Sequence, residues 1–429
     1  MAGKARFFLT EAMFSEVPHL LADANGFLVE AFRYKSGIAG LLVKNARCSF
    51  ILLPFNGQQI WRYGTLCEDF TMKSMYDEPA DTQEVLFLDI ETTGISRANS
   101  TVYLIGCINK QPEGWQITQW FDDTGLDEKM ILSSFLVFCG KYKYIINYNG
   151  NRFDLPFLRA RMEFHGLLSD AASFLSMESV DLYAYIAPYR HLLGLPDYRQ
   201  QTVEACLQTG RTEDADGKEL IDTYKKYLLL PSLEMLDILT LHNQANVEGL
   251  LKLLPLSAFS HLEKMNVTVT RAQANMYTDH EGKEAEELFI RFRMDFSLPA
   301  RIYAGADHCY LKIEGDSGIL KVPLYSEEMK YFYANYRDYY YLPAEDMAIH
   351  KYIATYVDPN RRIQAKPETC YTRKTSAYLP QWSLYRTPFF KRSFEDKSIF
   401  FEFSDEMKKD RAALSDYAAY VLRHIIFRK

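Results

Sequence analysis

The chain has 429 residues, of which 48% are hydrophobic, and this length predicts two or three domains with buried cores. A formal net charge of −7 excludes a basic field over the whole chain, so any site for a polyanion has to be local. The seven cysteines are scattered without a CxxC pair, which argues against a disulfide framework and a zinc site. No signal peptide or membrane span is evident, so we expect a cytoplasmic protein.

The first segment, residues 1–80, is predicted to be β-rich, with short strands at 40–44 and 49–53 and a polar linker at 77–81. Residues 50–61 and 71–79 resemble the opening β-sheet portion of aldose 1-epimerase-like (galactose mutarotase-like) proteins. The resemblance implies a truncated, fused β module rather than an active epimerase, since such enzymes draw their acid and base residues from a much longer β-supersandwich. Residual sugar binding stays open as an alternative.

Residues 84–256 alternate strand-like and helix-like segments, which is typical of an α/β domain. The first three predicted strands are joined by short loops that suit an antiparallel meander, and a fourth returns after a helix near 127–141. A mixed sheet of this kind, flanked by helices, resembles the ribonuclease H-like fold. The predicted strands are 85–90, 102–109, 115–121 and 144–148, and the later helices are 154–166, 200–208, 218–229 and 231–254.

Two acidic residues, Asp89 and Glu91, lie at the end of the apolar run 85–90. Alternate residues of a strand share one face, so both carboxylates would project together from an otherwise core-like strand. Two like charges side by side are costly without a cation, and Mg²⁺ and Mn²⁺ prefer oxygen ligands. The alternative is a strand end that reaches solvent, with both acids hydrated and a turn at residues 92–94.

A second polar segment follows the fourth predicted strand, which ends at Asn149-Gly150. The next helix is predicted to begin near Asp154, where the free backbone amides of a helix N-terminus favour negative charge. Asp154 is therefore a candidate site residue, and the alternative is that it only caps the helix.

The two segments together, Asp-x-Glu-Thr-x-Gly at 89–94 and Asn-Gly-x-x-Phe-Asp-Leu-Pro at 149–156, resemble the first two exonuclease motifs of the DEDD superfamily of 3′-to-5′ exonucleases. Within that superfamily the closer likeness is to the YprB-like ribonuclease H-like family, and it covers roughly residues 84–255. The likeness extends through residues 181–183, 210–214, 217 and 242–246.

This resemblance implies a two-metal phosphodiesterase site. Two Mg²⁺ or Mn²⁺ ions would clamp the scissile phosphate, one activating water and the other stabilising the leaving oxygen. Carried over by position, Asp89 would bridge both ions, Glu91 would hold the water-activating ion and Asp154 would support the second. Contacts with single-stranded nucleic acid are predicted for three further motif residues, Thr92, Asn149 and Phe153.

The chain departs from the superfamily at Asn246, which stands where the fourth carboxylate belongs. Asparagine keeps one carbonyl oxygen as a possible ligand but lacks the negative charge of a carboxylate. The attraction lost is about 4 kcal/mol for each pair of unit charges about 4 Å apart at an effective dielectric constant of about 20, and solvent screens much of it. Weak metal binding or an inactive site is therefore one of the hypotheses. His242 precedes Asn246 by four residues on the same helix face, at a position that the superfamily often fills with a water-orienting tyrosine or histidine. We predict His242 as general base or water-orienting group; a surface or core histidine is the alternative.

Residues 257–429 are predicted to form an α+β accessory domain that ends in a helix near 410–424. Aromatic and basic side chains interleave from Tyr331 to Arg392, and such a pattern suits stacking on bases and contact with phosphates. Arg373 and Lys374 are the predicted nucleic-acid contacts. The alternative is that these aromatic side chains form a core.

Three functions are compatible with the sequence. The first is a metal-dependent exonuclease acting on single-stranded DNA or RNA, weakened by Asn246. The second is a catalytically inactive ribonuclease H-like module that binds nucleic acid or scaffolds other proteins. The third is a carbohydrate-binding or epimerase-derived protein. Divalent-metal affinity separates the first from the second, and stabilisation by hexoses would indicate the third.

Overall fold

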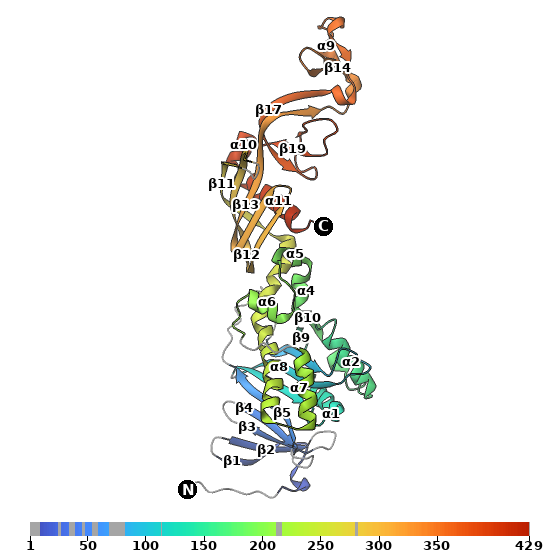
Figure 1. Ribbon diagram of the computed structural model, residues 1–429, viewed down its shortest axis with the longest axis vertical. Coiled ribbons are helices and arrows are strands. Elements are labelled where there is room, and N and C mark those ends of the chain that lie inside the picture. The colour runs from blue at the N-terminus through green and yellow to red at the C-terminus, as the bar shows by residue number, and fades with distance from the viewer. Residues whose placement is uncertain are drawn as a thin grey trace. The chain divides into compact units, whose positions relative to one another are not determined.

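A computed structural model of the chain describes residues 9–24, 27–33, 39–44, 48–53, 59–67, 82–112, 114–211, 217–278 and 282–428. The predicted linker at 77–81 and the mutarotase-like segment at 71–79 lie outside the described residues. The chain divides into two compact units, shown in Figure 1. The first consists of Met1–Pro188 and Leu195–Ser257, and the second of Tyr189–Gly194 and Ala258–Lys429.

The described part of the first unit contains a ten-stranded sheet with the order β1-β2-β3-β4-β5-β8-β7-β6-β9-β10. Five antiparallel strands from the N-terminal segment form one side of it, and β5 pairs antiparallel with β8 (Gly114–Phe121). The N-terminal strands thus continue the sheet of the α/β region, while their origin as a separate module stays a prediction. The five strands are β1 (His19–Ala24), β2 (Phe27–Arg33), β3 (Ala39–Lys44), β4 (Cys48–Leu53) and β5 (Gln59–Cys67).

The other half of the sheet is the predicted meander with parallel additions. Strands β6 (Val85–Thr92), β7 (Val102–Gln111) and β8 pair antiparallel in sequence order. Strand β9 (Tyr144–Asn147) then pairs parallel with β6, and β10 (Glu178–Asp181) pairs parallel with β9. The mixed sheet expected from the sequence is confirmed, and each of the four predicted strands lies within three residues of its observed bounds.

Helices cover this half of the sheet on both faces, which explains why its strands are apolar on both sides. On one face, Leu86, Leu88 and Ile90 of β6 pack in a core with side chains of α1 (Glu128–Cys139), α2 (Asp154–Phe164) and α3 (Ala172–Leu175). On the other face, α7 (Gly217–Leu229) and α8 (Leu233–Leu253) pack over β6 to β8, with the rings of Tyr103 and Tyr224 stacked at 4.0 Å.

Helix α8 begins at Ser232, whose hydroxyl accepts a hydrogen bond from the backbone N–H of Met235. The period of two along β6 leaves Asp89 and Glu91 on the face that α8 covers, since the intervening Ile90 belongs to the opposite core. Shorter helices complete the first unit: α4 (Leu182–Ile186) and α6 (Gln200–Cys206).

In the second unit, the described residues form a six-stranded sheet with the order β11-β12-β13-β17-β19-β18 and a small sheet with the order β15-β14-β16. Helix α11 (Arg411–Ile426) packs on β11, β12 and β13, burying Tyr417, Val421, Leu422 and Ile425. The strands are β11 (Val267–Thr278), β12 (Glu284–Ala306), β13 (Cys309–Phe332), β14 (Tyr339–Leu342), β15 (Met347–His350), β16 (Ile363–Gln364), β17 (Tyr371–Gln381), β18 (Phe389–Phe390) and β19 (Ile399–Glu402). The remaining α-helices of this unit are α5 (Arg190–Leu193), α9 (Lys351–Ala354) and α10 (Asp405–Lys409).

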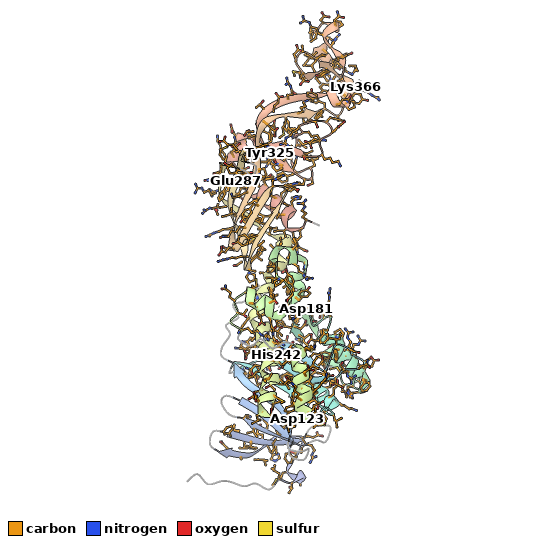
Figure 2. All side chains as sticks on the ribbon, viewed as in Figure 1. Asp123, Asp181, His242, Glu287, Tyr325 and Lys366 are labelled. Atoms are coloured by element: carbon orange, nitrogen blue, oxygen red, sulfur yellow. The ribbon has the colours of Figure 1, made fainter. Side chains whose placement is uncertain are left out.

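Many aromatic side chains of the second unit are structural. Tyr325, labelled on β13 in Figure 2, packs against the buried Phe400, and the Arg392 guanidinium lies 4.7 Å from its ring centroid. Tyr333 stacks on Tyr339 with ring centroids 4.4 Å apart. These contacts favour the core interpretation for the aromatic residues that they involve.

None of the helices in the described parts of the chain combines the length and the apolar character needed to cross a membrane.

Candidate active site

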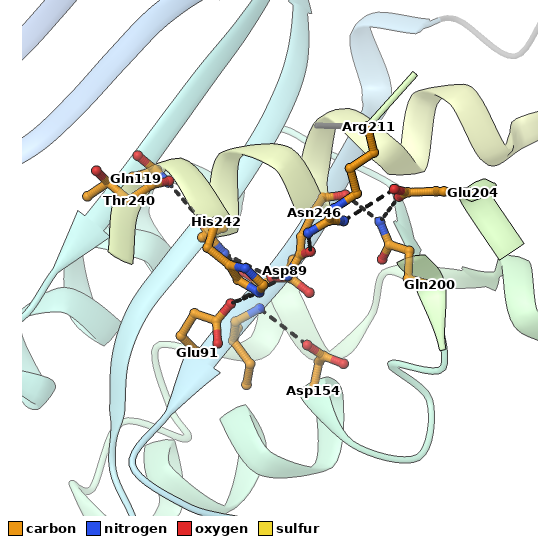
Figure 3. Close-up of polar contacts among 12 residues, drawn as sticks. Asp89, Glu91, Gln119, Asp154, Gln200, Glu204, Arg211, Thr240, His242 and Asn246 are labelled. Atoms are coloured by element: carbon orange, nitrogen blue, oxygen red, sulfur yellow. Dashed lines mark hydrogen bonds and ion pairs between the residues drawn. The ribbon is translucent and has the colours of Figure 1, made fainter. Parts of the chain in front are cut away.

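The candidate site residues of the two motifs and of α8 meet at β6, as Figure 3 shows. Asp89 and Glu91 project from β6 toward α8, where the Asn246 Nδ2 lies 3.1 Å from Asp89 Oδ2 and 3.4 Å from Glu91 Oε1. Asp154 opens α2 and accepts a hydrogen bond from the backbone N–H of Ile90 at 3.3 Å. Three separate segments therefore place these polar side chains together around one strand.

His242 lies one helical turn before Asn246 and faces the same strand. Its Nε2 is 3.6 Å from Glu91 Oε1, and its side chain is 7% exposed. The ring is thus held beside the second carboxylate of the first motif, labelled in Figure 3. A histidine in this position can accept a proton or orient a water molecule, provided that the reacting group reaches it.

Asn246 is fixed at both ends of its side-chain amide. The amide nitrogen donates to Asp89 and Glu91, and the Oδ1 accepts a 2.9 Å hydrogen bond from Arg211 Nη2. The backbone carbonyl of Asn246 accepts from Gln200 Nε2 at 2.7 Å. The amide hydrogens therefore face the carboxylates, and the carbonyl oxygen faces the guanidinium.

A second amide, that of Asn243, also donates to Asp89. Asn243 Nδ2 lies 3.0 Å from Asp89 Oδ2, and its Oδ1 accepts from Gln119 Nε2 at 2.9 Å. Gly106 is the residue of β7 that pairs with Asp89, and a Cβ there would come 1.9 Å from Asn243 Oδ1. A glycine within a strand often marks such a close approach, so Gly106 makes room for the Asn243 contact.

Burial of the acidic side chains is the largest influence on the pKa values at the site. Burial raises the pKa of Asp89, against the hydrogen bonds from Asn246 and Asn243 and the charges of His242 and Arg211, which lower it. Burial, together with the neighbouring Asp89, raises the pKa of Asp154 well above its usual range. Uncompensated carboxylates close together hold protons more tightly, and an added cation would relieve the same repulsion.

Comparisons with known proteins bear on the domain that carries this site. Residues 86–256 match the family model of the RNase_H superfamily. These residues are hereafter the RNase H-like domain, and they contain β6 except its first residue, β7 to β10, α8 and all five predicted catalytic residues. The search of the curated proteins finds no match.

Several solved structures are similar to this chain. The family B DNA polymerase of the hyperthermophilic archaeon Pyrobaculum calidifontis is 16% identical with a TM-score of 0.33, over 59% of this chain and 35% of the polymerase. An exonuclease I structure is 14% identical with a TM-score of 0.28, over 49% of this chain and 55% of that one. E. coli exonuclease I in complex with a dT13 oligonucleotide is 12% identical with a TM-score of 0.27, over 49% of this chain and 54% of that chain. This chain thus spans only about a third to a half of their lengths.

The acidic side chains of the RNase H-like domain fit a hard divalent cation in their chemistry. Asp89, Glu91 and Asp154 offer carboxylate oxygens, which Mg²⁺ and Mn²⁺ prefer, and the pKa of Asp154 is raised by burial and, as a smaller contribution, by the neighbouring Asp89. Over the described ranges, His, Cys, Asp and Glu side chains form no group of three arranged as a metal site. Asn246 presents hydrogens rather than its oxygen, so ligation by Asn246 requires its amide to turn.

The motif residues predicted to contact nucleic acid have local structural roles. Thr92 Oγ1 donates to the carbonyl of Gly94 at 2.9 Å. Asn149 adopts a φ of 59°, a conformation that asparagine tolerates better than most residues, and its N–H donates to Asp181 Oδ1 at 2.7 Å. Phe153 packs against the core beside α2. Their contacts with nucleic acid stay predictions.

The two predicted nucleic-acid contacts of the second unit are engaged in ion pairs. Arg373 Nη1 lies 3.2 Å from Glu328 Oε1, and Lys374 Nζ lies 2.7 Å from Glu402 Oε2. Arg373 also donates to the backbone carbonyl of Glu345 at 2.9 Å. Binding of a phosphate by either residue would compete with these pairs, and that role stays a prediction.

Sequence reasoning missed the polar residues that surround the carboxylates. Asn243 could have been found, because it lies three residues before Asn246 and therefore on the same helix face. Arg211 carried a weaker signal, its place in the segment 210–214 that resembles the YprB-like family. Gln200 and Glu204 carried none, since only the tertiary fold brings α6 beside α8.

Proposed function

We propose that the RNase H-like domain is a metal-dependent 3′-to-5′ exonuclease that hydrolyses phosphodiester bonds of single-stranded DNA or RNA. The observation that carries this proposal is the convergence of Asp89, Glu91 and Asp154 beside His242 within a domain that matches the RNase_H superfamily. Carboxylates from separate segments are the ligands that a phosphodiesterase metal site needs, and burial, together with the neighbouring Asp89, raises the pKa of Asp154.

Each residue of the site would have a separate role in hydrolysis. Asp89, Glu91 and Asp154 would hold Mg²⁺ or Mn²⁺, which when bound would activate water and stabilise the leaving oxygen. His242, oriented by Glu91 at 3.6 Å, would accept a proton from the attacking water or fix its direction. Asn243 would keep Asp89 in position through its 3.0 Å hydrogen bond.

A second candidate function is a nucleic-acid-binding or scaffolding module without turnover. The observation that favours it is the Asn246 amide, which turns its hydrogens toward Asp89 and Glu91 and so partly compensates the charge of both carboxylates. The missing fourth carboxylate weakens cation binding further, because it removes one negative charge from the site.

Degradation of 5′-labelled single-stranded DNA and RNA in Mg²⁺ or Mn²⁺ separates the two functions. The chain would be compared with Asp89→Ala, with Asn246→Asp, and with Asp170→Ala, which removes an exposed carboxylate of the same unit. Shortening from the 3′ end that Asp89→Ala abolishes and Asp170→Ala preserves would support the exonuclease. Cutting by Asn246→Asp alone would favour the binding module. If none of the four proteins cuts, the exonuclease proposal is wrong.

A further inference from the structure

Arg211 connects the carboxylate site to a buried acid. Its Nη2 donates to Asn246 Oδ1 at 2.9 Å, and its Nη1 lies 3.2 Å from Glu204 Oε2. The side chains of Arg211 and Glu204 are 9% and 1% exposed. Figure 3 shows the Arg211 guanidinium between Asn246 and Glu204. Two partners fix the orientation of its planar group.

The anchor for Arg211 is itself tightly held. Glu204 on α6 lies against Gly249 of α8, where a Cβ would come 1.9 Å from Glu204 Oε1. Gln200 Nε2 donates both to Glu204 Oε1 and to the Asn246 backbone carbonyl, each at 2.7 Å. Together Arg211, Glu204 and Gln200, here called the Arg211 latch, tie both the side chain and the backbone of Asn246 to α6.

This arrangement opposes the binding of a cation. If Asn246 turned to offer its Oδ1 to a metal ion, its amide hydrogens would face the Arg211 guanidinium, donor against donor, and the 2.9 Å hydrogen bond would be lost. The positive charge of Arg211 also repels a divalent cation at the same carboxylates. The orientation of the amide and the charge of the guanidinium therefore both weaken the binding of a cation.

We infer that Arg211 is a positioning residue that holds the Asn246 amide with its hydrogens on Asp89 and Glu91 and thereby weakens divalent-cation binding at this site. The inference rests on the proposed metal-dependent function and concerns the affinity of the site for its metal ion. The chain carries a neutral residue in place of the fourth carboxylate, and the Arg211 latch stabilises the orientation in which the amide hydrogens of this residue face Asp89 and Glu91.

The test is Mn²⁺ binding to the full chain after removal of metal, measured by calorimetry and by the shift in melting temperature that Mn²⁺ produces. Arg211→Met should bind Mn²⁺ about tenfold more tightly, which corresponds to about 1.4 kcal/mol. Arg159→Met, which removes an exposed arginine of α2, should bind as the wild type does. Because Arg211→Met leaves Glu204 buried without its cation, Arg211→Met/Glu204→Gln provides a second variant that removes the pair together and should show the same gain.

Introducing Arg211→Met into the Asn246→Ala variant separates the effect of the amide orientation from the effect of the Arg211 charge, because Asn246→Ala has no side-chain amide at this position. There the gain from Arg211→Met should fall to less than about threefold, because a double-mutant cycle leaves only the charge effect. A full gain in that background would mean that Arg211 acts by charge alone, and would overturn the inference.

Unchanged Mn²⁺ affinity in Arg211→Met and in the double variant, with tighter binding by Asn246→Asp, would overturn the inference and leave the proposed metal site standing. If none of the variants, Asn246→Asp included, binds Mn²⁺, both the inference and the metal-dependent function are wrong.

Discussion

The stability of the first unit should depend on one buried ion pair, between Arg161 on α2 and Glu128 on α1. Arg161 donates to Glu128 through Nε at 2.8 Å and Nη2 at 2.6 Å, and the two side chains are 6% and 5% exposed. Glu128 also accepts from the backbone N–H of Val102 and contacts His165 Nε2, each at 2.8 Å. The carboxylate thus joins two helices to the start of β7, and α2 begins with Asp154.

Replacing Arg161 with methionine keeps most of the side-chain volume but leaves a buried carboxylate short of its cation. Each lost hydrogen bond to a charged group is worth about 1.5–3 kcal/mol, and removing one partner of a buried pair typically costs about 3–5 kcal/mol. We expect Arg161→Met to lower the free energy of unfolding of the first unit by about 3–4 kcal/mol at pH 7.

The cost should depend on pH. Burial would raise the pKa of Glu128, but the hydrogen bonds from Arg161, His165 and Val102 outweigh it and lower the pKa below its ordinary value. The stabilisation is therefore complete above the ordinary glutamate pKa of about 4.3 and is lost as the pH falls through the lower value of the folded state. The difference between wild type and Arg161→Met should shrink over that acidic range.

Hydrogen exchange of peptides from α1 and α2 measures this local free energy directly. Arg159→Met, an exposed change on the same helix, should stay within about 0.5 kcal/mol of wild type. The double variant Arg161→Met/Glu128→Gln should recover part of the loss, because it removes the buried charge. A loss below about 1 kcal/mol at pH 7 in Arg161→Met would refute the reasoning, since it would mean that the pair contributes no more than a surface contact.

Two further substitutions test the site itself. Gly106→Ala should lower the free energy of unfolding by about 1–3 kcal/mol, because the added Cβ would lie 1.9 Å from Asn243 Oδ1. Gly140→Ala is the control and should not lower it, because the nearest atom to its added Cβ is 3.7 Å away. Equal melting temperatures for the two variants would contradict the close approach at Gly106. Asp154→Asn should raise stability in EDTA at pH 7 by at least about 1 kcal/mol, because burial and Asp89 raise the pKa of Asp154 and its ionisation therefore destabilises the folded state. That gain should fade as the pH drops toward about 4, and a gain that did not change with pH would contradict its electrostatic origin.

Local patterns predicted four of the five strands in the α/β half of the first unit, β6 to β9, but not β10. The period of two along β6 placed Asp89 and Glu91 on one face, and the helical spacing of His242 and Asn246 placed both side chains on one face of α8. Only the family resemblance predicted that this face of α8 lies beside β6. The amide orientation of Asn246 could not be predicted, because it depends on Arg211, 35 residues away in sequence. The pairing of β5 with β8 was equally hidden, since hydrogen bonds between strands distant in sequence leave no periodic signal in either strand.

In the second unit, composition indicated aromatic and basic side chains but could not assign them. Tyr378 is fully buried, and Lys374, four residues earlier, pairs with Glu402 across β17 and β19. Partners such as Glu402 lie in another segment of the chain. The pattern of an interleaved run of tyrosine and lysine therefore does not distinguish side chains that face solvent from side chains that contact a neighbouring strand.

The pairing of β5 with β8 also affects how the protein could be divided. Without the N-terminal strands, β8 would be the last strand of its sheet, with unpaired N–H and C=O groups along residues 115–119 that form its register with β5. Open strand edges of this kind recruit other chains and lead to aggregation. Strand β5 therefore covers the edge of the RNase H-like domain at β8, and a fragment that begins at residue 82 would expose that edge to pairing with other chains.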